Sequence, residues 1–464
     1  MSETRPRVRI VTLGCAKNEV DSEEIAGVLQ QDGFAVDGTS ECVDLVVLNT
    51  CGFLDAAKKE SIAAIREAVA EKKAGRVGRV VVAGCLAQRM GADLMKQAPG
   101  ADAYVGVGQM GRFGEIARSA LAAREVTLDV SPPHHRWADV PTRARSGQPW
   151  SAYLKLSEGC DHPCTFCTIP SFRGRHQSKP IERVLQEARH LARQGARELN
   201  LIAQDVTQYG YDLYRAFTLP KLLRELNGVE GVDWIRLLYF YPSRLTDEVI
   251  EAMASLDRVV PYIDIPLQHV HPDVLRRMKR PGDGEKYLRL FEKLRAAMPE
   301  VAIRTTFIVG FPGETDAEFE ALISFMEEAR LDRVGAFVFS REPGTPAYEL
   351  PNQVPSRVKR ARFDRLMRTQ QGISLEINQD WVGKEIDVLV EQHRDGWSVG
   401  RSRRDAPEID GFVYLCGELP LGEIVRGVVT EADPYDLYGD PVGQGRPKVR
   451  RLTTLRMAAP ASPQ

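Results

Sequence analysis

The sequence of 464 residues contains no uninterrupted apolar run of the roughly 18 residues that a membrane-spanning helix needs. Its first five residues, MSETR, include no apolar stretch, so we expect no secretory signal and a cytoplasmic location. The formal net charge is only −2, so the molecule as a whole is not an obvious binder of phosphate. The length exceeds that of one ordinary core and predicts two to four globular domains.

Cysteine is also scarce, with eight residues in the whole chain. Six of them fall into two groups of three, and the other two, Cys42 and Cys416, are interpreted as ordinary buried thiols. In a protein that is not secreted, clustered cysteines indicate metal or redox sites, because disulfides are rare in reducing compartments.

The first group lies in the run 159–167 (GCDHPCTFC), where Cys160, Cys164 and Cys167 have the spacing C-x3-C-x2-C. Three thiolates this close can bind one face of an iron–sulfur cluster. Because a cubane cluster takes four ligands, one iron is left open, and an open iron predicts a catalytic site. A zinc site with His162 or His176 as the fourth ligand is the alternative.

The first 125 residues alternate predicted strands and helices, a rhythm typical of a parallel sheet. The predicted strands span residues 7–13, 44–49 and 79–83, and the predicted helices span residues 21–31, 56–73 and 87–97. Each strand is followed by a cysteine of the second group: Cys15, Cys51 and Cys85, which are 36 and 34 residues apart.

These three cysteines are expected to converge in space, because the carboxyl ends of parallel strands share one edge of a sheet and ligands bind there. Gly14, Gly52 and Gly84 lie beside them and allow a close approach of the backbone. The pattern predicts a second cluster with three protein ligands and another open iron. Three unrelated buried cysteines at strand ends are the alternative.

Residues 131–149 are rich in Pro, Ser and Arg and are predicted to be a linker in which His134 and His135 are solvated. A metal site at this pair of histidines is the alternative.

A second series of strands begins near residue 152 and predicts an incomplete barrel of six βα units. The predicted strands are 153–156, 198–202, 234–239, 262–266, 304–309 and 334–339, and the helices between them include 181–194, 284–297 and 316–330.

The carboxyl ends of these strands carry polar groups, and function in such barrels is found at that face. We expect them to line a cavity, although each could serve only its own loop. They are Gln204, Asp205, Gln268, His269, Gly310, Gly313, Glu314, Ser340 and Arg341.

Beyond residue 381 the pattern changes to short strands at 385–390, 397–400, 411–415 and 424–430, which predict a small all-β barrel of the OB-like kind. Residues 381–440 contain thirteen acids against six bases, so this barrel should repel phosphate and attract a basic partner. A solvated acidic surface without a partner is the alternative. Arg401, Arg403 and Arg404 leave a local RNA contact open. The tail from residue 457 is predicted to be disordered.

These motifs together resemble the radical S-adenosylmethionine methylthiotransferases over nearly the whole chain. Within that family, residues 13–18 (LGCAKN), 20–23 (VDSE), 263–269 (IDIPLQH) and 435–439 (YDLYG) are similar to the RimO branch. The sister MiaB branch, which modifies an adenosine in tRNA, usually has Gln and Met where Ala16 and Lys17 stand here.

The resemblance implies an N-terminal methylthiotransferase domain (1–130), a linker (131–149), a radical-SAM core (150–378), a TRAM domain (379–445) and a tail (446–464). The fold class is then α/β plus all-β: an open parallel sheet, a partial (βα)6 barrel and a small antiparallel barrel. Two 4Fe–4S clusters and S-adenosylmethionine are the implied cofactors. Cys160, Cys164 and Cys167 would hold the cluster that cleaves S-adenosylmethionine, and Cys15, Cys51 and Cys85 the auxiliary cluster for sulfur transfer.

By the same resemblance, Phe166, Gln204 and Asp205 are candidates for binding S-adenosylmethionine, with plain core packing as the alternative for Phe166. No catalytic residue beyond the cluster ligands is expected. The implied reaction transfers a methylthio group to the β-carbon of an aspartate in ribosomal protein S-twelve, with an external electron donor and sulfur source; neither a membrane nor tRNA is an expected partner. A tRNA methylthiotransferase and a non-catalytic iron–sulfur carrier or RNA-binding module are the alternatives.

Overall fold

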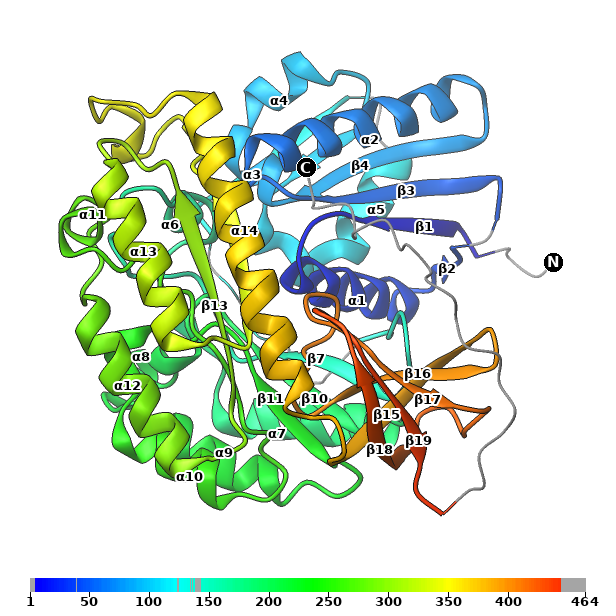
Figure 1. Cartoon of the computed structure of the whole chain (residues 1–464). Helices are drawn as coiled ribbons and strands as arrows, with labels where there is room; N and C mark the ends of the chain where they lie inside the picture. The colour runs from blue at the N-terminus through cyan, green and yellow to red at the C-terminus, as the bar shows by residue number, and fades with distance from the viewer. Residues whose placement is uncertain are drawn as a thin grey trace.

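The computed structural model describes residues 5–443, except 39, 123–124, 134, 136 and 138–142. The chain forms three parts: an N-terminal sheet, a partial barrel and a small C-terminal barrel, with the long helix α14 running between them (Figure 1). The predicted tail lies outside the described residues. Within the described residues, no helix is both long and apolar enough to span a membrane.

The N-terminal part is a sheet of six parallel strands in the order β2-β1-β3-β4-β5-β6, as the βα rhythm predicts. Its strands are β1 Arg7–Thr12, β2 Ala35–Val36, β3 Val43–Thr50, β4 Val77–Gly84, β5 Ala103–Val105 and β6 Thr127–Asp129. Helices α1 (Ala16–Gln31) and α5 (Phe113–Ala122) cover one face, and α2 (Asp55–Lys73) and α4 (Ala92–Gln97) cover the other. The apolar strands are therefore buried on both sides.

One predicted helix of this part is wrong. Residues 85–97 form two short helices, α3 (Cys85–Met90) and α4, because Gly91 between them has a φ of 50° and ends the first. The interpretation of Cys42 as a buried thiol is also wrong, because it lies exposed in the loop before β3; Cys416, in contrast, is buried as predicted.

The middle part is the predicted incomplete barrel of six parallel strands, β7 Ser151–Lys155, β10 Glu198–Ile202, β11 Trp234–Leu237, β12 Tyr262–Asp264, β13 Ala302–Val309 and β14 Arg333–Val338. Two three-stranded sheets, β7-β10-β11 and β12-β13-β14, are joined where the Phe240 amide donates to the Asp264 carbonyl. The larger helices around them are α7 Ile181–Arg193, α9 Leu219–Asn227, α10 Asp247–Ser255, α12 Gly284–Ala297 and α13 Asp316–Ala329. One continuous apolar core fills the space between strands and helices.

Short elements connect the barrel strands: β8 Ser157–Glu158, α6 Ile169–Arg173, β9 Gln177–Ser178, α8 Tyr211–Tyr214 and α11 Pro272–Arg277. The start of α13 is fixed by a capping box, in which Thr315 accepts from the Glu318 amide and the Glu318 side chain accepts in return. Helix α14 (Ser356–Gln379), which we did not predict, packs on β14 and α13 and leads into the last part.

The C-terminal part is a closed five-stranded barrel in the order β15-β16-β17-β19-β18. Its strands are β15 Glu385–Arg394, β16 Trp397–Ser402, β17 Val413–Cys416, β18 Ile424–Ala432 and β19 Leu437–Pro441. The sequence predicts four of them; β19 was missed, yet it pairs with both β17 and β18 and so closes the barrel.

Of the three arginines that leave a local RNA contact open, two have their charges paired inside the protein. Arg401 is 1% exposed and ion-pairs with Glu198 and Glu391, and Arg404 pairs with Asp332. Arg403 is half-buried and donates to the Asp257 carbonyl. These contacts attach the small barrel to the partial barrel.

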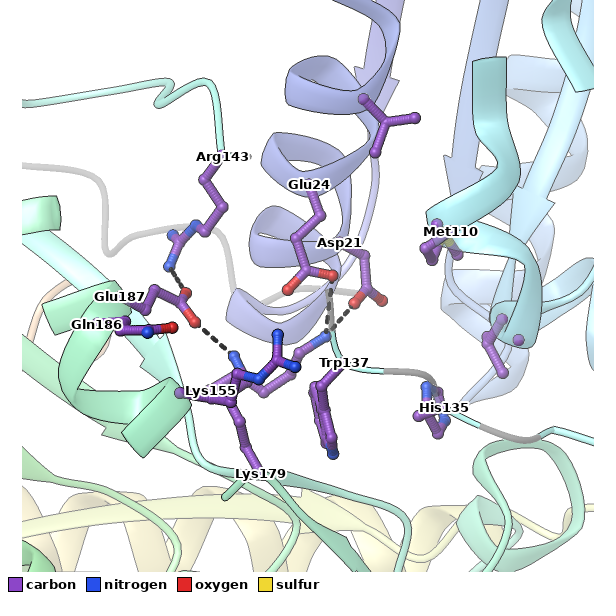
Figure 2. Close-up of a pocket in the computed structure, with 15 residues that line it drawn as sticks. Asp21, Glu24, Met110, His135, Trp137, Arg143, Lys155, Lys179, Gln186 and Glu187 are labelled. Carbon is purple, nitrogen blue, oxygen red and sulfur yellow. Dashed lines mark hydrogen bonds and ion pairs between the residues drawn. The ribbon is translucent and has the colours of Figure 1, made fainter. Parts of the chain in front are cut away.

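The predicted linker packs against the domains on either side of it, and its described residues are not uniformly solvated. Arg143 is buried and ion-pairs with Glu23 of α1 and Glu187 of α7, and Figure 2 shows it pointing at Glu187. His135 is half-buried, so its interpretation as a solvated side chain is wrong; His134 lies outside the described residues. A buried guanidinium needs carboxylate partners, and they come from both neighbouring domains.

Candidate metal centres

The three N-terminal cysteines converge at the carboxyl edge of the sheet, as predicted. Cys15 precedes α1, Cys51 follows β3 and Cys85 begins α3, and the strands before them end in register. A Cβ added to Gly14 would lie 2.7 Å from the Cβ of Cys51, and Gly14 has a φ of 101°, so the two cysteine loops touch only because this residue is glycine. Cys15 is exposed, Cys51 half-buried and Cys85 buried, so the group opens on the side of Cys15.

Asn18, in the first turn of α1, holds the three cysteine loops together. Its side-chain amide donates to the carbonyls of Leu13 (2.7 Å) and Thr50 (3.3 Å), and its Oδ1 lies 3.6 Å from the Cys85 sulfur. The geometry of the cysteine group thus depends on Asn18, whose role cannot be predicted from its place in the segment 13–18 (LGCAKN).

Arg173, at the end of α6, connects this group to the C-x3-C-x2-C loop. Its Nε lies 3.2 Å from the Cys85 sulfur, and its other nitrogens donate to Glu158 (2.8 Å), Asn18 (2.7 Å) and Asp21 (2.9 Å). The side chain is 3% exposed. The sequence does not predict this role, because nothing marks Arg173 except its place six positions after Cys167.

The second group, Cys160, Cys164 and Cys167, lies in the loop between β8 and α6. The loop is fixed by backbone bonds, from the Cys160 amide to Gly174 and from the Cys167 amide to Cys164. Burial raises the pKa of the Cys160 and Cys167 thiols to about 12. Free thiols here are therefore neutral, and a bound metal would have to hold them as thiolates, as metal ions do.

In both histidines of the zinc alternative the Nε2 nitrogen already has a partner. His162 stacks on Tyr241 with 3.6 Å between ring centroids, and its Nε2 lies 2.7 Å from Asp205. The Nε2 of His176 is bonded to Ser178 at 3.1 Å. This arrangement favours an iron–sulfur cluster with an open position over a four-ligand zinc site.

Two of the other polar groups at the strand ends, Glu314 and His269, are buried inside the protein. Glu314 is buried and accepts from the amides of Gly310 and Phe311 and from Arg362, so it builds its own loop and does not line a cavity. His269 is fully buried, and burial lowers its pKa to about 3.

Lys17 lies between the N-terminal cysteines and the mouth of the barrel. Its Nζ is 3.2 Å from the centroid of the Tyr239 ring, which follows β11 by two residues. Burial lowers the pKa of its ammonium to about 8, although the nearby Cys15 and Asp264 oppose the shift.

Comparison with known proteins covers all three parts of the chain. The family model described as the Radical SAM superfamily matches residues 154–326, that of the uncharacterized protein family UPF0004 matches residues 7–106, and that of the TRAM domain matches residues 382–442. The protein named ribosomal protein uS12 methylthiotransferase RimO from Moorella thermoacetica is 47% identical over 94% of this chain and 99% of its own. The protein of the same name from Desulforamulus reducens is 43% identical over the same shares.

The chain belongs to the RimO family of radical SAM methylthiotransferases.

Solved structures support the fold alone. The radical S-adenosylmethionine methyltransferase TsrM from Kitasatospora setae is 16% identical and superposes with a TM-score of 0.57 over 88% of this chain and 80% of its own. The cobalamin-dependent radical enzyme OxsB matches with a TM-score of 0.53 over 80% of this chain and 56% of its own, at 13% identity.

The cofactors of a RimO family member are 4Fe–4S clusters and S-adenosylmethionine, and the side chains here fit them. Each cysteine group offers three thiols and leaves one coordination position for a ligand that is not cysteine. Near the second group, the Oε1 of Gln204 is buried and has no hydrogen-bond partner among the described residues, so it can accept a bond from a bound ligand.

Proposed function

We propose that this chain transfers a methylthio group to the β-carbon of one aspartate in ribosomal protein uS12, using two 4Fe–4S clusters. The observation that carries the proposal is the pair of three-cysteine groups joined through Arg173, which contacts Cys85 and ends the helix that follows Cys167. Relatives that match nearly full length carry this substrate in their name. We assign the methylthiotransferase, radical-SAM and TRAM domains to residues 1–130, 150–378 and 379–445, which contain the three matched ranges.

In this proposal Cys160, Cys164 and Cys167 hold the cluster that binds S-adenosylmethionine, and Cys15, Cys51 and Cys85 hold the auxiliary cluster. When bound, these groups supply the 5′-deoxyadenosyl radical and the methylthio group. An unactivated C–H bond needs such chemistry because no side chain can deprotonate it at neutral pH. The protein contributes placement of the substrate and exclusion of water.

Three residues are assigned to S-adenosylmethionine with different roles. Gln204 offers its unpaired Oε1, while its amide donates to Glu158 at 3.3 Å. Asp205 accepts from the Thr207 amide and contacts His162, so it acts by fixing the loop around the ligand. Phe166 packs against the apolar cluster of Val274, Met278 and Phe311, so its packing role is established and its contact with adenine is part of the proposal.

The C-terminal barrel is proposed to receive the basic ribosomal protein. Because Arg401 and Arg404 are buried in ion pairs, the exposed charge of the barrel is dominated by acids. The exposed acids are Glu385, Asp395, Glu408, Glu418, Glu423 and Glu431, against the exposed bases Lys384, Arg394 and Arg426. Such a surface favours a cationic protein over the phosphates of tRNA.

The decisive experiment offers uS12 and tRNA in separate anaerobic reactions with a reductant and a sulfur source, and detects products by mass spectrometry. We expect a methylthio adduct on an aspartate of the ribosomal protein, lost in Cys15→Ala and in Cys164→Ala. An adduct on tRNA alone would contradict the substrate assignment while leaving the cluster chemistry intact. The absence of 5′-deoxyadenosine from S-adenosylmethionine would instead indicate a non-catalytic carrier.

The role of the barrel has its own test with a matched control. Reversal of Glu385, Glu418 and Glu423 to lysine should weaken binding of uS12 and lower turnover at low substrate concentration. The control reverses three exposed acids of the partial barrel, Glu285, Glu327 and Glu328, and should have little effect. Equal effects of both triple variants would mean that the surface of the C-terminal barrel is not the docking site.

A further inference from the structure

We infer that Lys17 binds the side-chain carboxylate of the substrate aspartate and selects aspartate over its amide. The inference rests on the proposed function, because it takes an aspartate as the substrate. It adds a specificity-determining residue to the cluster ligands and the residues assigned to S-adenosylmethionine.

The first observation is the position of the ammonium group. Lys17 lies two residues after Cys15, the exposed member of the N-terminal cysteine group, and its side chain reaches the ring of Tyr239 at the carboxyl end of the barrel. A ligand bound at the Nζ of Lys17 therefore lies between the auxiliary cysteines and the mouth of the barrel. A substrate carbon has to occupy this region if a radical formed in the barrel is to act next to the auxiliary site.

The second observation is that the neighbouring cations already have carboxylate partners. Arg173 and Lys155 share Asp21 and Glu158. Among the described residues, no Asp or Glu oxygen lies within ion-pair distance of the Lys17 ammonium, whose contact is the face of Tyr239.

Asp264, an acid of the barrel mouth whose charge acts on Lys17, also has its own partners. Asp264 ion-pairs with Arg304 at 2.9 Å and accepts from the Tyr239 amide at 3.1 Å. A buried ammonium without an anion is costly, and an aromatic face offsets only part of that cost. An incoming carboxylate would supply the anion that the Lys17 ammonium lacks among the described residues.

Holding the carboxylate also fixes the reacting atom, because the β-carbon of aspartate is bonded directly to the carboxylate carbon. A bond from Lys17 to that group therefore restrains the β-carbon to within one bond of a fixed point. Asparagine has the same β-carbon but carries no charge, so its amide oxygen can accept from the ammonium but lacks the ion-pair attraction that a carboxylate adds in a buried site. Discrimination between Asp and Asn is therefore the property that Lys17 should control.

The test compares two forms of uS12, the natural protein and the protein in which the modified aspartate, located by mass spectrometry, is replaced by asparagine. Dissociation constants are measured by fluorescence anisotropy with cluster-loaded enzyme in the absence of reductant. For the unsubstituted enzyme we expect the Asp form to bind about tenfold tighter than the Asn form. In Lys17→Met and Lys17→Gln the ratio should fall to about one, and in Lys17→Arg it should be largely retained.

The control is Lys59→Met, which removes an exposed lysine of α2 and should leave the ratio unchanged. Iron content and circular dichroism establish that each Lys17 variant is folded and carries its clusters. Two neutral variants are used so that the test still stands if one of them does not fold. A tenfold preference that persists in both neutral variants would overturn the inference alone. An unsubstituted enzyme that modifies tRNA and neither form of uS12 would overturn the proposed function together with it.

Discussion

Replacing Arg173 by methionine should loosen the contact between the N-terminal sheet and the partial barrel. Its guanidinium makes four hydrogen bonds, to Asp21, Glu158, Asn18 and the Cys85 sulfur, and methionine keeps most of the apolar volume but none of the donors. The two acids belong to different parts of the chain, Asp21 to α1 and Glu158 to β8. The substitution therefore removes a cation shared across the interface.

The magnitude follows from what remains after the substitution. Asp21 and Glu158 would share one buried cation, Lys155, in place of two, which leaves one negative charge uncompensated. Removing one partner of a buried pair costs about 3–5 kcal/mol. We expect the free energy of local opening to fall by that amount, which corresponds to roughly two to four orders of magnitude in hydrogen-exchange protection.

The assay is amide hydrogen exchange of the cluster-loaded protein under anaerobic conditions, read by mass spectrometry for peptides of α1 and α6. The matched control is Arg175→Met two residues away, because Arg175 is 89% exposed and pairs with Asp161 at 3.1 Å on the surface. An exposed pair of this kind contributes about 0.5 kcal/mol, so protection should change little. Exchange in α1 that is the same for both variants would refute the reasoning.

Three further predictions use other parts of the molecule. Gly84→Ala should destabilise the protein by about 1–3 kcal/mol in chemical denaturation, because at a φ of 92° the added Cβ collides with the side-chain oxygen of Asn49. Burial holds the folded-state pKa of His269 at about 3, so between pH 6.5 and pH 3 only the unfolded chain gains the proton, and the protein loses stability as the pH falls. His269→Gln should remove this loss, which is about 1.4 kcal/mol per pH unit. Denaturation midpoints measured at several pH values would test this, and an unchanged slope in the variant would contradict it. Arg401→Met should expose the small barrel to limited proteolysis, because Glu198 keeps only Arg236 as its cation; unchanged cleavage would contradict a structural role for this pair.

Much of this architecture could be predicted from local pattern. The βα rhythm gives the parallel sheet and the six barrel strands, because alternating elements of this length leave few ways to bury both faces. The convergence of Cys15, Cys51 and Cys85 follows from the same rule, since strands in register end at one edge. The strand β19 was missed because its residues 437–441 include a glycine and a proline, and only pairing with β17 and β18 makes them a strand.

The sequence by itself marked the candidate ligands, because the spacing of Cys160, Cys164 and Cys167 and the positions of the strand-end cysteines are local features. Only the tertiary structure decided which charges meet. Arg173 reaches Cys85 across 88 positions of the chain, and Arg401 reaches Glu198 across 203. No local pattern encodes such pairs, because the energy of a buried charge depends on which partners the packed domains bring within a few ångströms and not on its neighbours in sequence. For the same reason, the sequence cannot show that Lys17 lacks a carboxylate partner among the described residues. That property depends on how the partial barrel packs against the N-terminal sheet.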